Sequence, residues 1–307
     1  MIKCTRPELR EGWTDNSYYV PCGYCPVCRK YDRESWKFRI QEEYKHSQNA
    51  WFLTVTYNDD NLPFLTGDGE IIRGVENARA GDWMTLVPED ATRFVKSIQK
   101  KQARAYREYK RTLHRDVGNV LRKPRVKYFI VGEYGSKTKR PHYHIILFNL
   151  LSEIAKQESL EKTWSDKKRI NSGYIQVKPL IDEQIGYVAN YIHDKWMYDE
   201  GLQIKPFRRP SKGLGEAYLT PPIKKHHRAL DKLYVRTKEG YKIRLPKYYI
   251  NKIWTEQEIL ELYKRLPDYG LVDDSELPTT KDISEQRVQT EYSIKSRISK
   301  RNKNEHI

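Results

Sequence analysis

The sequence lacks any long apolar run. No stretch of about 18 apolar residues occurs in it, so the sequence predicts no membrane-spanning helix and no membrane partner. The opening residues, Met1-Ile2-Lys3-Cys4, carry no signal-peptide pattern. These absences predict a protein that stays inside the cell. The length of 307 residues suits one large domain with appendages or two small ones, and no internal repeat is visible.

Cysteine is absent after residue 28. The four cysteines, Cys4, Cys22, Cys25 and Cys28, lie at the start of the chain, and the last three form a CxxCxxC pattern. In an intracellular chain this clustering argues against a disulfide framework and for a metal site. Glycine and proline between the cysteines bend the chain, so that three thiolates can converge on a zinc ion with Cys4 as the fourth ligand. An iron–sulfur cluster and free reduced thiols are the alternatives.

Acidic residues are too few to balance the basic ones. The chain has 57 Lys and Arg against 41 Asp and Glu, a formal charge of +16. Such an excess favours a polyanionic partner, and the 23 tyrosines and 7 tryptophans offer rings that can stack on unpaired bases. Nucleic acid is therefore the predicted partner, with a merely basic soluble protein as the alternative.

Periodicity and turn residues predict strands and helices in alternation. Strands are expected at 51–57, 127–133, 142–148 and 174–178, helices at 29–48, 88–115, 151–164 and 182–198, and a long loop at 62–87. The order strand, helix, strand, strand, helix, strand, helix suits an α+β fold. It predicts a central antiparallel sheet with helices packed on it, of ferredoxin-like type.

Two histidines stand on a predicted strand, in the stretch RPHYHIILF at 140–148. Side chains alternate along a strand, so His142 and His144 share one face. Glu133 ends the strand before them. Two imidazoles and one carboxylate form an open site for a divalent cation. The alternative is a pair of hydrogen-bonded histidines in a metal-free structural protein.

The predicted helix from residue 182 carries Tyr187, Tyr191 and Lys195 at intervals of four. Residues four apart lie on one face of a helix. An antiparallel sheet could place this face over the histidine hairpin. Tyrosines used only for packing, with a snorkelling lysine, are the alternative.

Three motifs in this order resemble those of the HUH endonucleases that start rolling-circle replication: FLTVTY at 52–57, PHYHIILF at 141–148 and YVANYIHDK at 187–195. The flanking segments PCGYCPVC, FLTVTYNDDNLP, GEYG and SKGLG narrow the resemblance. They are similar to the replication initiators of the Microviridae, small single-stranded DNA phages, and especially to the gokushovirus-like group. The resemblance covers about residues 20–220.

This resemblance implies a fold and roles for residues. The fold is that of an HUH endonuclease, a sheet like that of RNA-recognition motifs. His142 and His144 bind Mg²⁺ or Mn²⁺, with Glu133 as third ligand, and Tyr187 and Tyr191 are nucleophiles assisted by Lys195. The implied activity is site-specific nicking and joining of single-stranded DNA through a 5′-phosphotyrosine intermediate, which initiates and terminates rolling-circle replication.

The expected organisation has three parts. Residues 1–50 hold the cysteine segment and a basic helix, 51–200 the HUH endonuclease domain, and 201–307 a basic C-terminal extension with a mobile tail. The implied partners are single-stranded DNA at a replication origin and the helicase and polymerase of a bacterial host, in whose cytoplasm the protein would act.

Two classes of alternative stay open. A plasmid initiator, relaxase or transposase would share the chemistry. A non-catalytic nucleic-acid-binding protein would share the basic charge and the aromatic residues, and it predicts no covalent adduct with DNA.

Overall fold

The computed structural model describes residues 4, 8–10, 18–112, 125–165, 172–194, 203–238 and 240–265. The chain divides into two compact units. The central unit is Lys37–Tyr218, and the terminal unit combines Met1–Trp36 with Leu219–Ile307. Within the described ranges, every helix is too short or too polar to cross a membrane.

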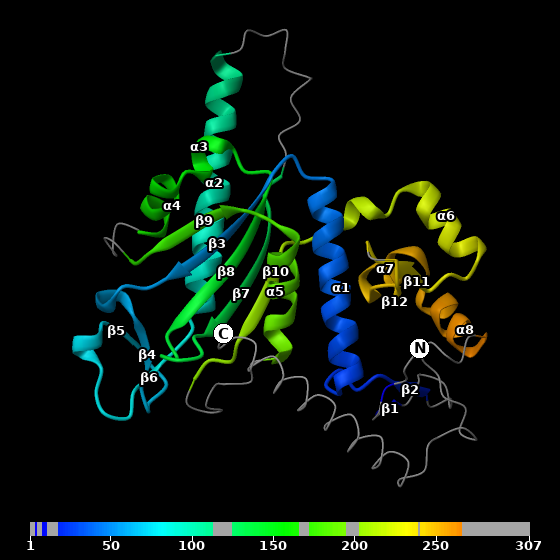
Figure 1. Ribbon diagram of the computed structural model, residues 1–307, viewed down its shortest axis with the longest axis horizontal. Coiled ribbons are helices and arrows are strands. Elements are labelled where there is room, and N and C mark those ends of the chain that lie inside the picture. The colour runs from blue at the N-terminus through cyan, green and yellow to red at the C-terminus, as the bar shows by residue number, and fades with distance from the viewer. Residues whose placement is uncertain are drawn as a thin grey trace, which may run out of the picture. The chain divides into compact units, whose positions relative to one another are not determined.

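The central unit is built on a five-stranded sheet with the order β10-β7-β8-β3-β9, in which every neighbouring pair is antiparallel (Figure 1). The strands are β3 (Ala50–Thr56), β7 (Lys127–Tyr134), β8 (Pro141–Phe148), β9 (Ile175–Pro179) and β10 (Phe207–Pro210). The helices are the second half of α1 (Pro26–Lys45), α2 (Pro88–Thr112), α3 (Ser152–Ala155), α4 (Gln157–Trp164) and α5 (Asp182–Asp194). The predicted α+β class with a central antiparallel sheet is confirmed.

Two elements differ from the sequence prediction in ways that change the sheet and its cover. The sheet gains a fifth, edge strand, β10, from the region expected to be a C-terminal extension. Pro210 is tolerated there because an edge strand leaves one side without ladder partners. The single helix expected at 151–164 is two helices, because Lys156 has an extended backbone between α3 and α4.

The long loop expected at 62–87 is wrong. This segment forms a small antiparallel sheet with the order β5-β4-β6. Its elements are η1 (Asp59–Asn61), β4 (Pro63–Leu65), β5 (Ile71–Arg73), η2 (Val75–Asn77) and β6 (Trp83–Met84). Strands of two or three residues are too short to show a period of two, so the glycine and aspartate turns dominated the prediction.

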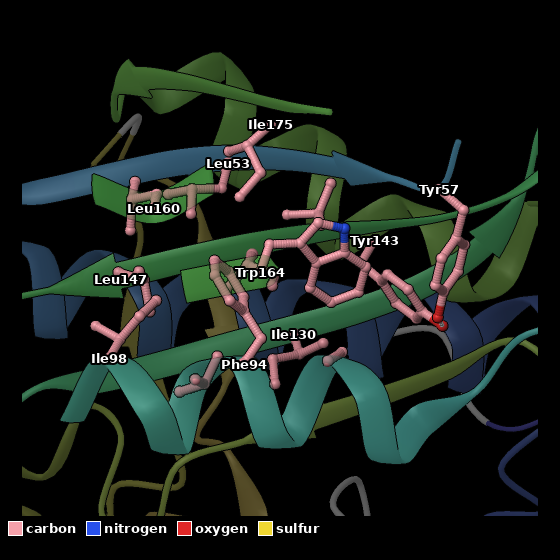
Figure 2. Packing of buried hydrophobic residues seen from close by; sticks show 14 of the residues in the cluster. Leu53, Tyr57, Phe94, Ile98, Ile130, Tyr143, Leu147, Leu160, Trp164 and Ile175 are labelled. Carbon is pink, nitrogen blue, oxygen red and sulfur yellow. Dashed lines mark hydrogen bonds between the residues drawn. The ribbon is translucent and has the colours of Figure 1, made fainter. Parts of the chain in front are cut away.

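One face of the large sheet packs against α2 and α4 (Figure 2). Trp164 of α4 stands in the middle of this core, with its ring centroid 5.4 Å from those of both Phe94 and Tyr57. The fully buried members are Leu53, Val55, Ile98, Ile130, Tyr143, Ile145, Leu147 and Leu160. Burying a large apolar side chain contributes about 1.5–3 kcal/mol, so this layer supplies much of the stability of the central unit.

A buried polar network ties the small sheet to α2. The hydroxyl of Tyr57 donates to Asp90 at 2.8 Å and lies 2.8 Å from the hydroxyl of Tyr143. Arg73 of β5 donates to the same carboxylate at 2.7 Å. Burial raises the pKa of Tyr57 and Tyr143 well above the ordinary value for a phenol. Both phenols therefore stay protonated at neutral pH and hold the structure together.

The opposite face of the sheet carries α5 and the second half of α1. Lys127 of β7 donates to Glu43 of α1 at 2.7 Å, and Tyr44 of α1 donates to the carbonyl of Leu180, just before α5, at 3.2 Å. These contacts fix both helices over the face that bears the paired histidines.

The terminal unit joins residues from both ends of the chain. Its elements are β1 (Glu8–Arg10), β2 (Tyr18–Val20), the first half of α1, α6 (Pro221–Ala229), β11 (Tyr234–Arg236), β12 (Lys242–Arg244), α7 (Lys247–Ile253) and α8 (Glu256–Arg265). Leu245, Tyr249 and Leu262 form part of its buried interior. The tail expected to be mobile, from about residue 278, lies outside the described residues.

Candidate functional site

The register of the sheet brings Glu133, His142 and His144 together. Glu133 of β7 pairs directly with His142 of β8, and Val131 pairs with His144, so the three side chains share a face. Nε2 of His142 lies 2.6 Å, and Nε2 of His144 3.1 Å, from the same carboxylate oxygen, Oε1 of Glu133. The ligand atoms of the three residues all lie within 4.8 Å of one another.

The outer nitrogen of each imidazole has its own contact. Nδ1 of His142 lies 3.2 Å from the carbonyl of Arg140, which can only accept, so Nδ1 carries the proton. Nδ1 of His144 lies 3.3 Å from the hydroxyl of Thr54, which stands directly opposite on β3. Contacts of this kind orient the ring and leave the lone pair of Nε2 for a metal ion.

The carboxylate of Glu133 is buried and only partly satisfied. The residue is 3% exposed, and within the described part of the chain its Oε2 has no hydrogen-bond partner. Leaving a buried acceptor unsatisfied costs roughly 1–3 kcal/mol, more for a charged group. Burial acts to raise the pKa of Glu133, but the hydrogen bonds with His142 and His144 outweigh it and hold the pKa below its ordinary value. An ionised carboxylate with two imidazoles fits a divalent cation.

Helix α5 places a phenol beside this set. The ring of Tyr187 lies edge-on to His144, with centroids 5.3 Å apart, and the residue is 40% exposed. Phe52 stacks on the same imidazole, with centroids 5.4 Å apart. The exposure of Tyr187 separates it from the buried phenols of Tyr57 and Tyr143, which solvent and a substrate cannot reach.

The other residues predicted on this helix are described less fully. Tyr191 follows Tyr187 by about one turn of α5, so the two positions lie on the same side of the helix. The side chain of Tyr191, and all of Lys195, lie outside the described residues.

Two neighbours of the site were missed in the sequence. Thr54 and Arg208 lie in one row across the sheet, with Val131 and His144 between Arg208 and Thr54. Adjacent strands are about 4.8 Å apart, so Arg208 stands roughly 10 Å from His144 on the same face. The alternation in FLTVTY places Thr54 on a face, but only the strand order decides that this face is next to His144.

A second donor set, in the terminal unit, consists of the four cysteines. The Sγ atom of Cys4 lies 3.5, 3.7 and 3.6 Å from those of Cys22, Cys25 and Cys28, and Cys22 lies 4.0 Å from Cys28. A tetrahedron with metal–sulfur bonds of about 2.3 Å has edges of about 3.8 Å. All four are free cysteines, and three are buried. The predicted convergence of the four sulfur atoms is confirmed.

Backbone groups also point at these sulfur atoms. The N–H of Cys22 donates to Cys4 at 3.4 Å and the N–H of Cys25 donates to Cys22 at 3.3 Å. Hydrogen bonds with Cys25 and Cys4 and burial raise the pKa of the Cys28 thiol above its ordinary value. A metal that binds here must therefore displace protons, which makes its affinity fall with falling pH.

Residues 50–196 match the model of the replication-associated protein family that is named after ORF2. The chain is 29% identical over 260 residues to replication-associated protein ORF2 of Spiroplasma virus 4, covering 80% of this chain and 72% of that protein. It is 25% identical over 244 residues to replication-associated protein VP4 of Bdellovibrio phage phiMH2K, covering 76% and 67%. The resemblance to phage replication proteins is confirmed.

Among solved structures, the N-terminal nuclease domain of non-structural protein 1 of minute virus of mice matches with 13% identity and a TM-score of 0.22. The match covers 60% of this chain and 79% of that domain.

Proposed function

We propose, from the premise that residues 50–196 belong to the ORF2 family of replication-associated proteins, that this protein nicks and rejoins single-stranded DNA at a replication origin. The observation that carries the proposal is an exposed phenol, Tyr187, beside a carboxylate and two imidazoles that fit a metal ion. Host helicase and polymerase would then unwind and extend the nicked strand in the bacterial cytoplasm.

Each group in the site has a part in this chemistry. A divalent cation, Mg²⁺ or Mn²⁺, held by Glu133, His142 and His144 would supply positive charge to non-bridging phosphate oxygens. The phenol oxygen of Tyr187 forms a bond to phosphorus as the bond to the 3′ oxygen breaks. The phenol proton passes to solvent and the 3′ oxygen takes up a proton, so a 5′-phosphotyrosine and a free 3′ hydroxyl result.

The second tyrosine completes the cycle in this proposal. The phosphotyrosine keeps the energy of the broken phosphodiester, so a later 3′ hydroxyl can reverse the step and close a circle. Tyr191, one turn away, gives a second exchange while the first end stays attached. Lys195 is proposed to help expose the phenolate, since an unperturbed tyrosine has a pKa of about 10. The domain proposed for this activity is 51–200, extended by the edge strand β10.

The direct test is a search for a covalent adduct. The full chain is incubated with single-stranded oligonucleotides that tile the genome encoding it, with Mg²⁺ or Mn²⁺, and the products are examined by intact-mass spectrometry. We expect one oligonucleotide to give an adduct on a tyrosine and a free 3′ hydroxyl fragment, and chelation to prevent both. Binding without any adduct, under every metal condition, would favour the non-catalytic alternative.

We also propose that Cys4, Cys22, Cys25 and Cys28 hold a structural zinc ion. Purified without added metal, the chain is expected to contain about one zinc, and Cys25→Ser is expected to lose it and to loosen the cysteine segment. Elemental analysis and limited proteolysis measure the two effects. Because a metal displaces the thiol protons, zinc retention should fall as the pH is lowered. Protein with neither zinc nor iron would contradict the proposal, and iron in place of zinc would favour a cluster.

A further inference from the structure

The terminal unit contains a strongly basic stretch that the nicking chemistry does not use. Residues 221–253 hold ten Lys and Arg and only two acidic residues. Part of this charge lies on the two-stranded ribbon of β11 and β12. Such a concentration of one sign favours a polyanion.

The ribbon has one buried and one charged face. Tyr234 pairs with Arg244, and Arg236 pairs with Lys242, so these four side chains share a face. Val235, between them in sequence, points the other way and is 5% exposed. The pair Arg236 and Lys242 is exposed. The pleat thus turns the apolar side chain inward and the cations to solvent.

Two cations of this face, Arg236 and Lys242, are not neutralised by carboxylates. Arg236 donates to the carbonyl of Gly240 at 3.0 Å, and the ammonium of Lys242 lies 4.7 Å from the centre of the Tyr234 ring. Within the described residues, neither cation forms an ion pair with an acidic side chain. Both charges remain available to an anionic partner.

The aromatic ring on this face is already occupied. The ammonium of Lys232 lies 5.1 Å from the centre of Tyr234, in addition to that of Lys242. Proteins that bind single strands stack several bases on free rings. The ribbon instead offers one exposed ring, Tyr241 at its turn, and a set of cations suited to phosphates.

We propose that the β11–β12 ribbon binds the phosphate backbone of double-stranded DNA. A two-stranded ribbon fits the major groove of B-form DNA, where its outward cations reach phosphates on both sides. This second surface goes beyond the proposed nicking function, which needs a single strand at Tyr187. It would hold the protein on duplex DNA independently of cleavage.

The test compares duplex and single-stranded DNA. Fluorescence anisotropy of the full chain, without added divalent metal, is measured over a range of salt concentrations with a short blunt duplex and with one of its strands. For Arg236→Gln/Lys242→Gln we expect duplex affinity at about 0.1 M salt to fall by about tenfold or more, and the salt slope to fall by about 1.8, since each phosphate contact adds about 0.9. Affinity for the single strand should change by less than about threefold.

Two variants serve as controls. Lys156→Gln/Lys162→Gln removes the same charge from α3–α4 and their junction, and we expect it to bind the duplex as the unmodified protein does. Arg236→Lys/Lys242→Arg keeps the charge and should also bind normally, which separates loss of charge from loss of fold. An unchanged duplex affinity, or an equal loss on both DNAs, would overturn the proposal. Because no cleavage is measured, a failure of the nicking proposal would not affect this result.

Discussion

Replacement of both Tyr187 and Tyr191 with phenylalanine is expected to abolish the covalent protein–DNA adduct completely while leaving DNA binding intact. The phenol oxygens are the nucleophiles in the proposed mechanism, and phenylalanine keeps the ring without the oxygen. The edge-to-face contact of residue 187 with His144 needs only the ring. The measurement is intact-mass spectrometry of the reaction with the cleaved oligonucleotide, beside anisotropy for binding.

The single variants separate the two tyrosines. Tyr187→Phe or Tyr191→Phe alone should leave some cleavage of a short oligonucleotide, because the remaining phenol can still attack. Either should fail in a full round, where two exchanges must alternate. Tyr109→Phe, at an exposed tyrosine of α2, is the matched control and should act normally. Peptide mapping that finds nucleotide on another residue, or an adduct in the double variant, would refute the assignment.

The second large effect is expected at the histidine pair. His142→Ala and His144→Ala should each lower the nicking rate by roughly 1000-fold or more, because each removes a ligand of the proposed metal ion. DNA affinity should change little, since it comes mainly from Lys and Arg on phosphates. Single-turnover cleavage at several Mn²⁺ concentrations measures the first effect, and anisotropy the second.

The surroundings of the pair offer a graded series. Glu133→Gln keeps the shape of the buried side chain but removes its charge, so it should weaken metal binding as strongly as a histidine variant. Thr54→Val removes the contact to Nδ1 of His144 and should cost about 10–100-fold in metal affinity. His46→Ala, at an exposed histidine, is the control. A wild-type nicking rate in either alanine variant of the pair would show that the metal site is wrongly placed.

Much of the central fold was predictable because the decisive signals are local. The strand containing His142 and His144 is marked by eight residues of consistent pattern, and the polar turn before it predicts the hairpin with Glu133. Helix α2 begins at Pro88, with acids in its first turn, as such helices do. The small sheet at 63–84 escaped because its strands are too short to carry a period.

The sequence by itself determined the kinds of ligand and their local faces: two imidazoles on one side of a strand, two phenols on one side of a helix, and four cysteines close in sequence. These follow from the periods of strand and helix, which depend only on neighbouring residues. Only the tertiary structure decided that Tyr187 meets His144, that Thr54 orients the same ring, and that β10 completes the sheet. Strand order and helix placement arise from packing between segments far apart in the chain, which no local pattern encodes. The same reason applies to the ribbon, whose charged face exists only because β11 and β12 pair with Val235 turned inward.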